Sequence, residues 1–270
     1  MRTKLTAAVL VYDTPELLPH FLNHYGKLGV DKILVGVATN ADNSLEDIVQ
    51  DISGNSPVET SVSRFSADHY VTSANHIERQ KMLEREHLQP DDWVVYVDLD
   101  EFHEYPVALC DIVRLCNQQE ILAIEGEWLD RIARDGTLAP ILATPDIGDQ
   151  FPIGCRLSRR LLHNFGRKVM ICRWKCNMTC AGHHHLNNCQ ANQWPIGAKW
   201  QYRVHHFKWN SNVLARLAKR LEMGAQVCDK HARECCRFLE LYERTKKIDL
   251  SGLKPRECGP FRCLHESFKP

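Results

Sequence analysis

The chain has no excess of charge of either sign and no long hydrophobic run. Its 34 Lys and Arg residues balance 34 Asp and Glu residues, so a net charge of zero gives no general attraction to nucleic acid or to an anionic membrane. No segment approaches the roughly 20 apolar residues that a membrane-spanning helix needs. The first apolar segment, residues 5–12, ends at Asp13 without a small-residue cleavage site and predicts a buried strand rather than a signal peptide. We therefore expect a cytoplasmic protein that binds no nucleic acid and has at most peripheral contact with the inner face of the membrane.

The chain also lacks internal repeats and low-complexity linkers. Of its 270 residues, 44% are hydrophobic, which is enough for one large core. Predicted strands occupy residues 5–12, 32–37, 58–65 and 93–97, and predicted helices occupy residues 17–28, 44–51 and 75–88. This alternation is typical of a Rossmann-like α/β fold, in which a mostly parallel central sheet is flanked by helices.

The second half of the chain follows a different pattern. Residues 144–201 are rich in proline, glycine, cysteine, histidine and asparagine, which predicts a loop-rich region. From residue 212 onward, apolar side chains recur at spacings of three and four, which predicts one long C-terminal helix with a bend at Gly224. We expect an α/β domain over residues 1–211 and a helical extension over residues 212–270 that packs on it.

Three carboxylates follow an apolar segment in the middle of the chain. Residues 93–97 read Trp-Val-Val-Tyr-Val, which predicts a central strand buried on both faces. Asp98 and Asp100 come next, project the same way from an extended backbone, and can contact one hard divalent cation of the kind that carries a diphosphate. Because ligands bind at the carboxyl ends of such strands, we expect a site here rather than a turn with solvated acids.

Twelve cysteines are present, and reduced thiols are the expectation for a chain without an export signal. Soft metal ligands gather between residues 172 and 189: Cys172, Cys176, Cys180, His183, His184, His185 and Cys189. Their spacing differs from the Cys-x-x-Cys pairing of common zinc modules. These residues either bind a structural Zn²⁺, or the thiols are buried without a metal and the histidines serve another purpose.

Four segments together resemble nucleotide-sugar glycosyltransferases with the A-type fold. These segments are residues 14–29, 94–102, 126–136 and 204–209, and the resemblance extends over residues 5–245. Within that group the chain is most similar to family 2 bacterial enzymes that have an Asp-x-Asp-Glu-Phe motif, here Asp98 to Phe102. It departs from the commonest family 2 pattern, because it has no Gln-x-x-Arg-Trp acceptor motif and no plain Glu-Asp pair for the catalytic base.

The resemblance implies an inverting transfer of a sugar from a UDP- or GDP-linked donor to a hydroxyl of a glycan, lipid-linked or small-molecule acceptor. It also implies Mn²⁺ or Mg²⁺ at the diphosphate, because a leaving nucleoside diphosphate develops negative charge in the transition state. Asp100 is the expected direct metal ligand, and Asp98 is expected to contact the ribose or the metal. Glu101 either supports the metal site or caps the next turn.

A histidine near the last helix is expected to complete the metal site. Related enzymes place one in this position, where the present chain has His205 and His206. Neighbouring residues of an extended segment point in opposite directions, so only one of the two can reach the metal, and we favour His206. Lys208 is expected either to neutralise the diphosphate or to be solvated.

The remaining candidates lie at strand ends and in the loop-rich region. Residues expected to contact the nucleotide lie at the ends of the first two strands: Tyr12, Asp13, Asn40 and Asp42. Asp130, with Glu127 as the alternative, is the candidate base that takes the acceptor proton. Arg131 either pairs with Asp130 or binds the acceptor, and His183 and His184 are expected to line the acceptor pocket within residues 144–201.

Two other functions fit parts of the sequence. Sugar nucleotidyltransferases have a similar α/β start, but they usually carry a glycine-rich phosphate loop near the first strand, and residues 11–16 contain none. A zinc-stabilised binding module without catalysis is supported only by the cysteines and histidines between residues 172 and 189.

Overall fold

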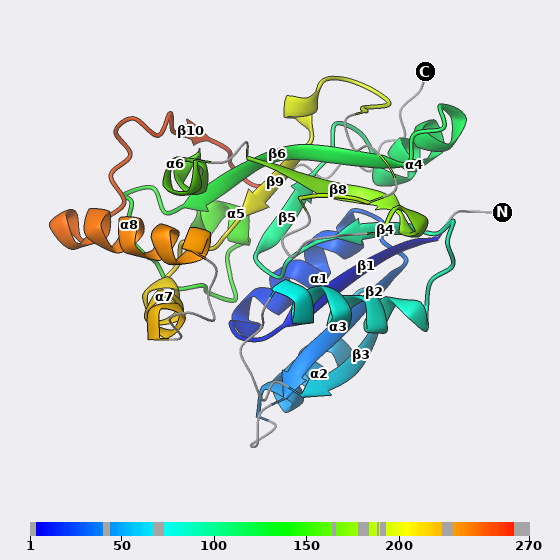
Figure 1. Cartoon of the computed structure of the whole chain (residues 1–270), viewed down its shortest axis with the longest axis horizontal. Helices are drawn as coiled ribbons and strands as arrows, with labels where there is room; N and C mark the ends of the chain where they lie inside the picture. The colour runs from blue at the N-terminus through cyan, green and yellow to red at the C-terminus, as the bar shows by residue number, and fades with distance from the viewer. Residues whose placement is uncertain are drawn as a thin grey trace. The chain divides into compact units, whose positions relative to one another are not determined.

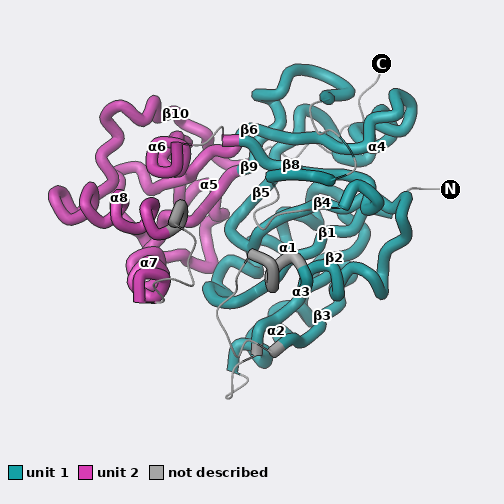
Figure 2. Tube along the Cα trace, viewed as in Figure 1, with its two compact units in different colours: residues 1–127, 167–204, 262–270 teal, residues 128–166, 205–261 magenta. Residues whose placement is uncertain are grey.

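The computed structural model describes residues 4–39, 44–66, 73–163, 166–177, 184–187, 189, 193–222 and 229–261. Contacts divide the chain into two compact units, which Figure 2 colours separately. Unit 1 comprises residues 1–127, 167–204 and 262–270, and unit 2 comprises residues 128–166 and 205–261. The expected domain boundary at residue 211 stays a prediction.

The elements of unit 1 first alternate between strand and helix, as Figure 1 shows along the blue part of the chain. In order they are β1 (Leu5–Val11), η1 (Pro15–Leu17), α1 (Leu18–Lys27), β2 (Lys32–Thr39), α2 (Ser44–Gly54), β3 (Glu59–Ser66), α3 (Ser73–Arg85), β4 (Trp93–Tyr96), β5 (Glu101–Glu104), α4 (Leu109–Gln118), β6 (Ala123–Ile132), β8 (Arg167–Arg173), η2 (Trp174–Cys176), η3 (Lys199–Gln201) and β9 (Arg203–His206). Strands β6 and β9 begin in unit 1 and end in unit 2.

Unit 2 contains shorter elements and two helices near the C-terminus. Besides the ends of β6 and β9, they are α5 (Ile147–Gln150), β7 (Ile153–Cys155), α6 (Leu157–Leu162), α7 (Val213–Glu222), α8 (Asp229–Thr245) and β10 (Arg256–Glu257). Within this unit β7 pairs with both β6 and β10, antiparallel in each case. In the part of the chain that the structure describes, no helix has the length and apolar character needed to cross a bilayer.

The sheet of unit 1 is mixed. Its strands follow the order β6-β8-β4-β1-β2-β3. The pairs β4–β1, β1–β2 and β2–β3 are parallel, whereas β8 is antiparallel to both β4 and β6. The expectation of an α/β fold with flanking helices is confirmed, but that of a mostly parallel sheet is wrong. Strands and helices also alternate after β4, from β5 through α4, β6, α5, β7 and α6 to β8, but β8 runs antiparallel to both of its neighbours, so alternation alone does not fix strand direction.

Helices cover the parallel strands on both faces. The β1–β2 and β2–β3 crossovers contain α1 and α2, which contact each other, while α3 returns the chain and packs on β1 and β2. Right-handed crossovers place α3 on the face opposite to α1 and α2. Gly36 in β2 permits this packing, because an added Cβ would lie 2.5 Å from a Leu10 methyl carbon and 3.1 Å from the Phe65 ring.

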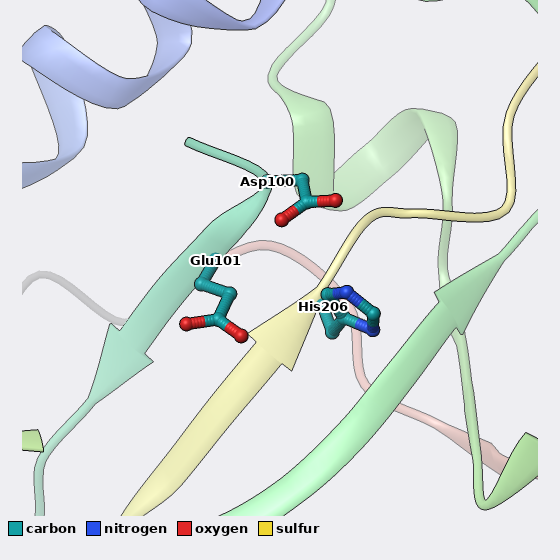
Figure 3. Close-up of side chains that lie close together, drawn as sticks. All are labelled: Asp100, Glu101 and His206. Carbon is teal, nitrogen blue, oxygen red and sulfur yellow. The ribbon is translucent and has the colours of Figure 1, made fainter. Parts of the chain in front are cut away.

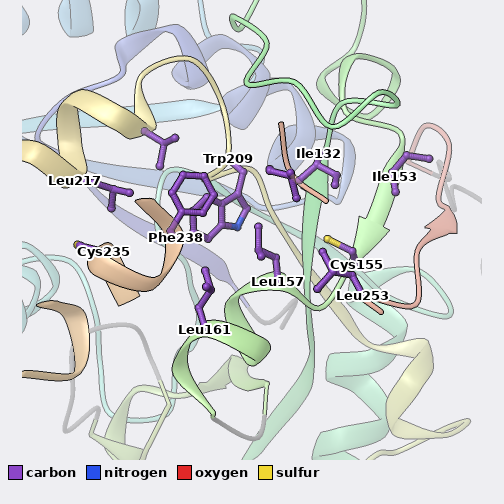
Figure 4. Packing of buried hydrophobic residues seen from close by; sticks show 12 residues of the cluster. Ile132, Ile153, Cys155, Leu157, Leu161, Trp209, Leu217, Cys235, Phe238 and Leu253 are labelled. Carbon is purple, nitrogen blue, oxygen red and sulfur yellow. The ribbon is translucent and has the colours of Figure 1, made fainter. Parts of the chain in front are cut away.

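The core of unit 2 is built around Trp209 (Figure 4). Its buried members are Ile132, Ile153, Cys155, Leu157, Leu161, Trp209, Val213, Leu217, Cys235, Phe238, Ile248 and Leu253. The predicted single C-terminal helix is instead two helices, α7 and α8, and Gly224 lies outside the described residues. Both helices bury an apolar stripe in the core that contains Trp209. Apolar residues therefore recur at helical spacing in both, and the sequence pattern predicts a single helix.

Removing a buried side chain from this core should cost far more than removing an exposed one from the same helix pair. Leu217 is fully buried on α7, whereas Leu241 on α8 is 38% exposed. Leu217→Ala should lower the free energy of unfolding by about 2–5 kcal/mol through lost apolar contact and a residual cavity. Leu241→Ala should lower it by about 0.5 kcal/mol or less. Urea denaturation measures both, and equal losses would contradict the described packing.

Glu84 is a buried acid near the C-terminal end of α3, in unit 1. It is 1% exposed, and its Oε2 accepts hydrogen bonds from Trp174 Nε1 at 2.9 Å and Tyr96 Oη at 3.4 Å. Burial raises the pKa of Glu84 to about 7, against the lowering effect of its hydrogen bonds. The folded state therefore binds this proton more tightly than the unfolded state does.

The raised pKa predicts a pH-dependent stability. Below the unfolded pKa of 4.5 the carboxyl is protonated in both states, and between pH 4.5 and 7 the unfolded state releases the proton while the folded state retains it. Stability should fall across this window, by on the order of 3 kcal/mol from Glu84. Glu84→Gln should remove that part of the slope in urea denaturation between pH 4.5 and 7.5. The exposed neighbour Glu86→Gln should keep it, and an unchanged slope in Glu84→Gln would contradict the assignment.

Candidate functional site

Unit 1 gathers acidic side chains where β4 ends. The strand is buried along its length, and Val97 after it is 1% exposed, so the first charged residue follows directly on the core. A tight turn comes next, in which the backbone N–H of Glu101 donates to the carbonyl of Asp98 at 3.0 Å. The N–H of Asp98 in turn donates to Glu101 Oε2 at 3.3 Å. The turn folds Glu101 back toward Asp98 at the carboxyl end of the strand.

Asp100 and Glu101 present carboxylates side by side at the start of β5. Figure 3 labels both side chains where the chain enters that strand. One oxygen of each lies within 4.8 Å of the other, a separation that one cation can bridge. Both are hard oxygen ligands, which Mn²⁺ and Mg²⁺ prefer, so the donor set in unit 1 fits the metal expected from the sequence.

Lys168 is the residue of this cluster that sequence reasoning missed. It lies near the start of β8, its side chain is 2% exposed, and its Nζ donates to Asp98 Oδ2 at 2.9 Å and to Glu101 Oε1. Burial disfavours the charged ammonium, but the carboxylates of Asp98 and Glu101 outweigh it and raise the pKa of Lys168 above its ordinary value. The available signal was a lysine directly before the four apolar residues of β8, Val169 to Cys172.

Tyr12 lies at the end of β1, the strand that pairs with β4 in parallel. Its ring packs edge-on against Phe65 with a centroid separation of 5.5 Å, and the Arg79 guanidinium lies 4.8 Å from the Phe65 ring centre. Burial raises the pKa of Tyr12 to about 12, so its hydroxyl remains a hydrogen-bond donor. The nearby charge of Asp98 contributes to this rise, which places Tyr12 at the same edge of the sheet as the acids.

The nucleotide contacts expected beside Tyr12 lie partly outside the described residues. Asp13 is exposed, and its Oδ1 accepts a hydrogen bond from the Thr14 hydroxyl at 2.9 Å. Asn40 and Asp42 fall in the segment that the structure leaves undescribed. All of these nucleotide roles stay predictions.

Unit 2 holds a separate polar cluster around Asp130. This residue of β6 is 2% exposed, and its carboxylate accepts four hydrogen bonds. The donors are Ser158 Oγ at 2.6 Å, Ser158 N at 2.7 Å, Trp209 Nε1 at 2.8 Å and His206 Nδ1 at 3.0 Å. Burial acts to raise the pKa of Asp130, but the hydrogen bonds from His206 and Ser158 outweigh it and hold that pKa below its usual range.

This arrangement suits a positioning group better than a base. A general base must meet the acceptor hydroxyl within hydrogen-bond reach, and the Asp130 oxygens are buried and already accept from protein donors. Glu127, the alternative candidate, lies in unit 1 on β6 and is half-buried. Its catalytic role, like that of Asp130, stays a prediction.

His205 and His206 have different partners within unit 2, and the metal role of His206 stays a prediction. His206 Nδ1 meets Asp130, whereas His205 Nδ1 lies 3.2 Å from an Nη of Arg131. The Trp128 ring packs against the His206 imidazole with a centroid separation of 4.7 Å. Figure 3 shows the His206 ring at the end of β9.

Two basic residues expected to meet ligands have protein partners. Arg131 is 1% exposed and donates to the carbonyls of Phe151 at 2.7 Å, Gly148 at 2.8 Å and Gly259 at 2.9 Å, and so ties β6 to neighbouring loops. Lys208 is buried and forms an ion pair with Glu234 of α8. Both contacts are structural, and the ligand-binding roles of Arg131 and Lys208 stay predictions.

The cysteine-rich segment contains a disulfide between Cys176 and Cys189. The expectation of reduced thiols throughout is therefore wrong for this pair, and two of the sulfur ligands counted for Zn²⁺ are lost to it. Cys180 and His183 lie outside the described residues, and His184 Nδ1 lies 2.6 Å from the Arg167 carbonyl. The acceptor role of His183 and His184 stays a prediction.

The chain matches no protein-family model and has no significant sequence match among curated proteins. It is similar in structure to the mannosyltransferase PcManGT from Pyrobaculum calidifontis in complex with GDP-Man and Mn²⁺, at 14% identity and a TM-score of 0.35, over 50% of this chain and 36% of that one. It is similar to mannosyl-3-phosphoglycerate synthase from Rubrobacter xylanophilus at 12% identity and a TM-score of 0.38, over 93% of this chain and 78% of that one.

A UDP-glucose pyrophosphorylase complexed with UDP-glucose is similar at 7% identity and a TM-score of 0.33, over 90% of this chain and 88% of that one. This chain thus spans well under two thirds of the length of the mannosyltransferase, whereas it spans most of the other two proteins. Identities and TM-scores this low assign neither a family nor an activity.

Replacing Lys168 tests the ion pairs of unit 1. Lys168→Met should lower the free energy of unfolding by about 3–5 kcal/mol at pH 7, because it leaves the buried carboxylate of Glu101 without its cation. Lys175→Met is the matched control: Lys175 pairs with Asp91, both are largely exposed, and its loss should cost about 1 kcal/mol or less. Thermal and urea denaturation of the two variants measures both losses of stability. Similar losses would contradict the buried role of Lys168.

Proposed function

We propose that this protein transfers a sugar from a nucleoside diphosphate sugar to a hydroxyl acceptor, with inversion and with the help of a divalent cation. The observation that carries the proposal is the acid cluster at the carboxyl end of β4, inside unit 1. Asp98, Asp100 and Glu101 bring three carboxylates together there, and Lys168 forms ion pairs with two of them, Asp98 and Glu101. Such a site favours a divalent cation and repels a bare diphosphate.

Each residue of the cluster has a separate proposed role. Asp100 and Glu101, whose oxygens lie within 4.8 Å of each other, supply carboxylate ligands to Mn²⁺ or Mg²⁺. Asp98, held by Lys168, accepts a hydrogen bond from the ribose or contacts the metal through its other oxygen. The nitrogen ligand from His206, which lies in unit 2, stays a prediction of the resemblance to A-type glycosyltransferases.

The base of the donor nucleotide is proposed to stack against Tyr12 and Phe65. An aromatic pair beside an arginine offers both stacking and a cationic edge to a nucleobase, and Tyr12 lies at the same strand edge as the acids. A nucleotide on this edge extends its diphosphate toward the end of β4.

Sugar transfer then depends on charge and on one proton. A cation held by Asp100 and Glu101 would offset the negative charge that develops on the leaving diphosphate. The acceptor hydroxyl loses its proton to a carboxylate on the opposite side of the sugar, for which Glu127 is the proposed base in view of the buried environment of Asp130. The acceptor is a glycan, a lipid-linked sugar or a small molecule.

Calorimetric titration of UDP and GDP tests the donor site. Binding of one of them should be at least about 10-fold tighter in Mn²⁺ than in excess chelator, because two carboxylates that face a diphosphate repel it without a bridging cation. Asp100→Asn should remove this metal dependence. Asp91→Asn is the matched control, since Asp91 is an exposed acid before the amino end of the same strand.

Equal affinity with and without chelator in the native protein would overturn the metal role of the cluster. Product analysis separates the reaction classes: release of nucleoside diphosphate from a nucleotide sugar supports glycosyl transfer. Formation of a nucleotide sugar from a nucleoside triphosphate and a sugar phosphate would instead assign nucleotidyl transfer and overturn the proposed glycosyl transfer. One tightly held zinc per chain without nucleotide binding would favour the zinc-stabilised module.

A further inference from the structure

We infer that Asp130 is a positioning residue that fixes His206 in the tautomer with hydrogen on Nδ1 and so presents Nε2 as the metal-binding atom. The geometry is contained in unit 2. His206 Nδ1 lies 3.0 Å from Asp130 Oδ1, and both side chains are buried, at 7% and 3% exposure. Metal-binding histidines commonly donate their second ring N–H to a carboxylate in this way.

The hydrogen is assigned to Nδ1 because Asp130 serves as an acceptor throughout its contacts. Trp209 Nε1 and the backbone N of Ser158 can only donate, and each bonds to the Asp130 carboxylate, at 2.8 Å and 2.7 Å. These donors stabilise the ionised form of the carboxyl group, which has no hydrogen of its own to give, so His206 Nδ1 has to donate to it. A neutral imidazole with hydrogen on Nδ1 has its lone pair on Nε2.

Two further contacts fix the direction of that lone pair. The Trp128 ring packs against the His206 imidazole at 4.7 Å between ring centres, with the two rings tilted by 53°. Ser158, in the first turn of α6, binds both oxygens of Asp130 through its hydroxyl and its backbone N–H and so prevents the carboxylate from rotating. Trp128 therefore restricts the position of the imidazole ring, and the fixed Asp130 carboxylate restricts the position of the hydrogen on Nδ1.

The tautomer of His206 is independent of the proposed function, whereas its consequence for metal binding depends on that function. Long-range ¹⁵N–¹H correlation spectra of the full, ¹⁵N-labelled, metal-free chain at pH 8.5 report the tautomer of each neutral imidazole. The signals of His206 are those missing from the spectrum of His206→Gln. They should show hydrogen on Nδ1, although free neutral imidazole side chains favour hydrogen on Nε2. Hydrogen on Nε2 in the native protein would overturn the inference without any variant.

Asp130→Asn tests the cause. A neutral amide accepts hydrogen bonds less strongly than a carboxylate and cannot satisfy all four donors, so an Nε2–H population of His206 should appear. Ser158→Ala keeps the carboxylate and should keep hydrogen on Nδ1. Dispersed spectra and a cooperative melt confirm that each variant is folded. A folded Asp130→Asn chain that stays entirely in the Nδ1–H form would overturn the inference.

Electron paramagnetic resonance of MnCl₂ titrations gives the second readout, since it counts unbound Mn²⁺ directly. Asp130→Asn should weaken Mn²⁺ binding by about 10- to 100-fold, and His206→Gln by at least as much. A tautomer change with unaltered Mn²⁺ affinity would overturn the role of Asp130 toward the metal. A native chain that binds no Mn²⁺ would overturn the proposed function and leave the tautomer result standing.

Discussion

The buried contact of Lys168 with Asp98 and Glu101 is the interaction on which the acid cluster of unit 1 depends. A strand buried on both faces cannot carry charge, so charged residues appear where β4 leaves the core. At that point the carboxylate of Glu101 is 1% exposed, which is tolerable only beside a cation. Lys168 supplies that cation from the neighbouring antiparallel strand. The mixed sheet, which departs from a purely parallel one, is therefore what brings the balancing charge to the site.

A buried carboxylate in unit 2, that of Asp130, also needs partners that stabilise its charge. Asp130 is buried and ionised, and its charge is stabilised by four donors rather than by an ion pair with a lysine or arginine. Those donors include His206, so the network that makes a buried carboxylate acceptable also sets the orientation of the histidine. The network also joins the hydrophobic core of unit 2, because Trp209, one of the donors, is a buried member of that core.

The first part of the fold could be predicted because its signals are local. The apolar run of β1, the proline at the start of the helical turn after it and the apolar stripe of α1 each lie within a few residues. The same holds for the acids after β4, which follow directly on an apolar strand. The acids were therefore expected at the end of β4, where the structure places them, and their role as a site stays a prediction.

The rest could not be predicted because it depends on partners far apart in the chain. Lys168 meets Asp98 across 70 residues, and Asp130 meets His206 across 76, which no spacing rule detects. The antiparallel pairing of β6 and β8 leaves no local mark, because helices α5 and α6 lie between these strands in the chain just as crossover helices lie between parallel strands. Helices α7 and α8 were predicted as one helix because both bury an apolar stripe in the same core. Periodicity reports which face is buried, but not where a helix is interrupted.

The most direct test of the account is the position of a bound metal and nucleotide. Crystals grown with UDP or GDP and MnCl₂ would be measured at the manganese absorption edge, where anomalous scattering identifies the ion. The account predicts a manganese peak at bonding distance from the Asp100 carboxylate, with the nucleotide base against Tyr12 at the carboxyl end of β1. Manganese bound elsewhere, or a nucleotide seated away from the ends of β1 and β4, would contradict it.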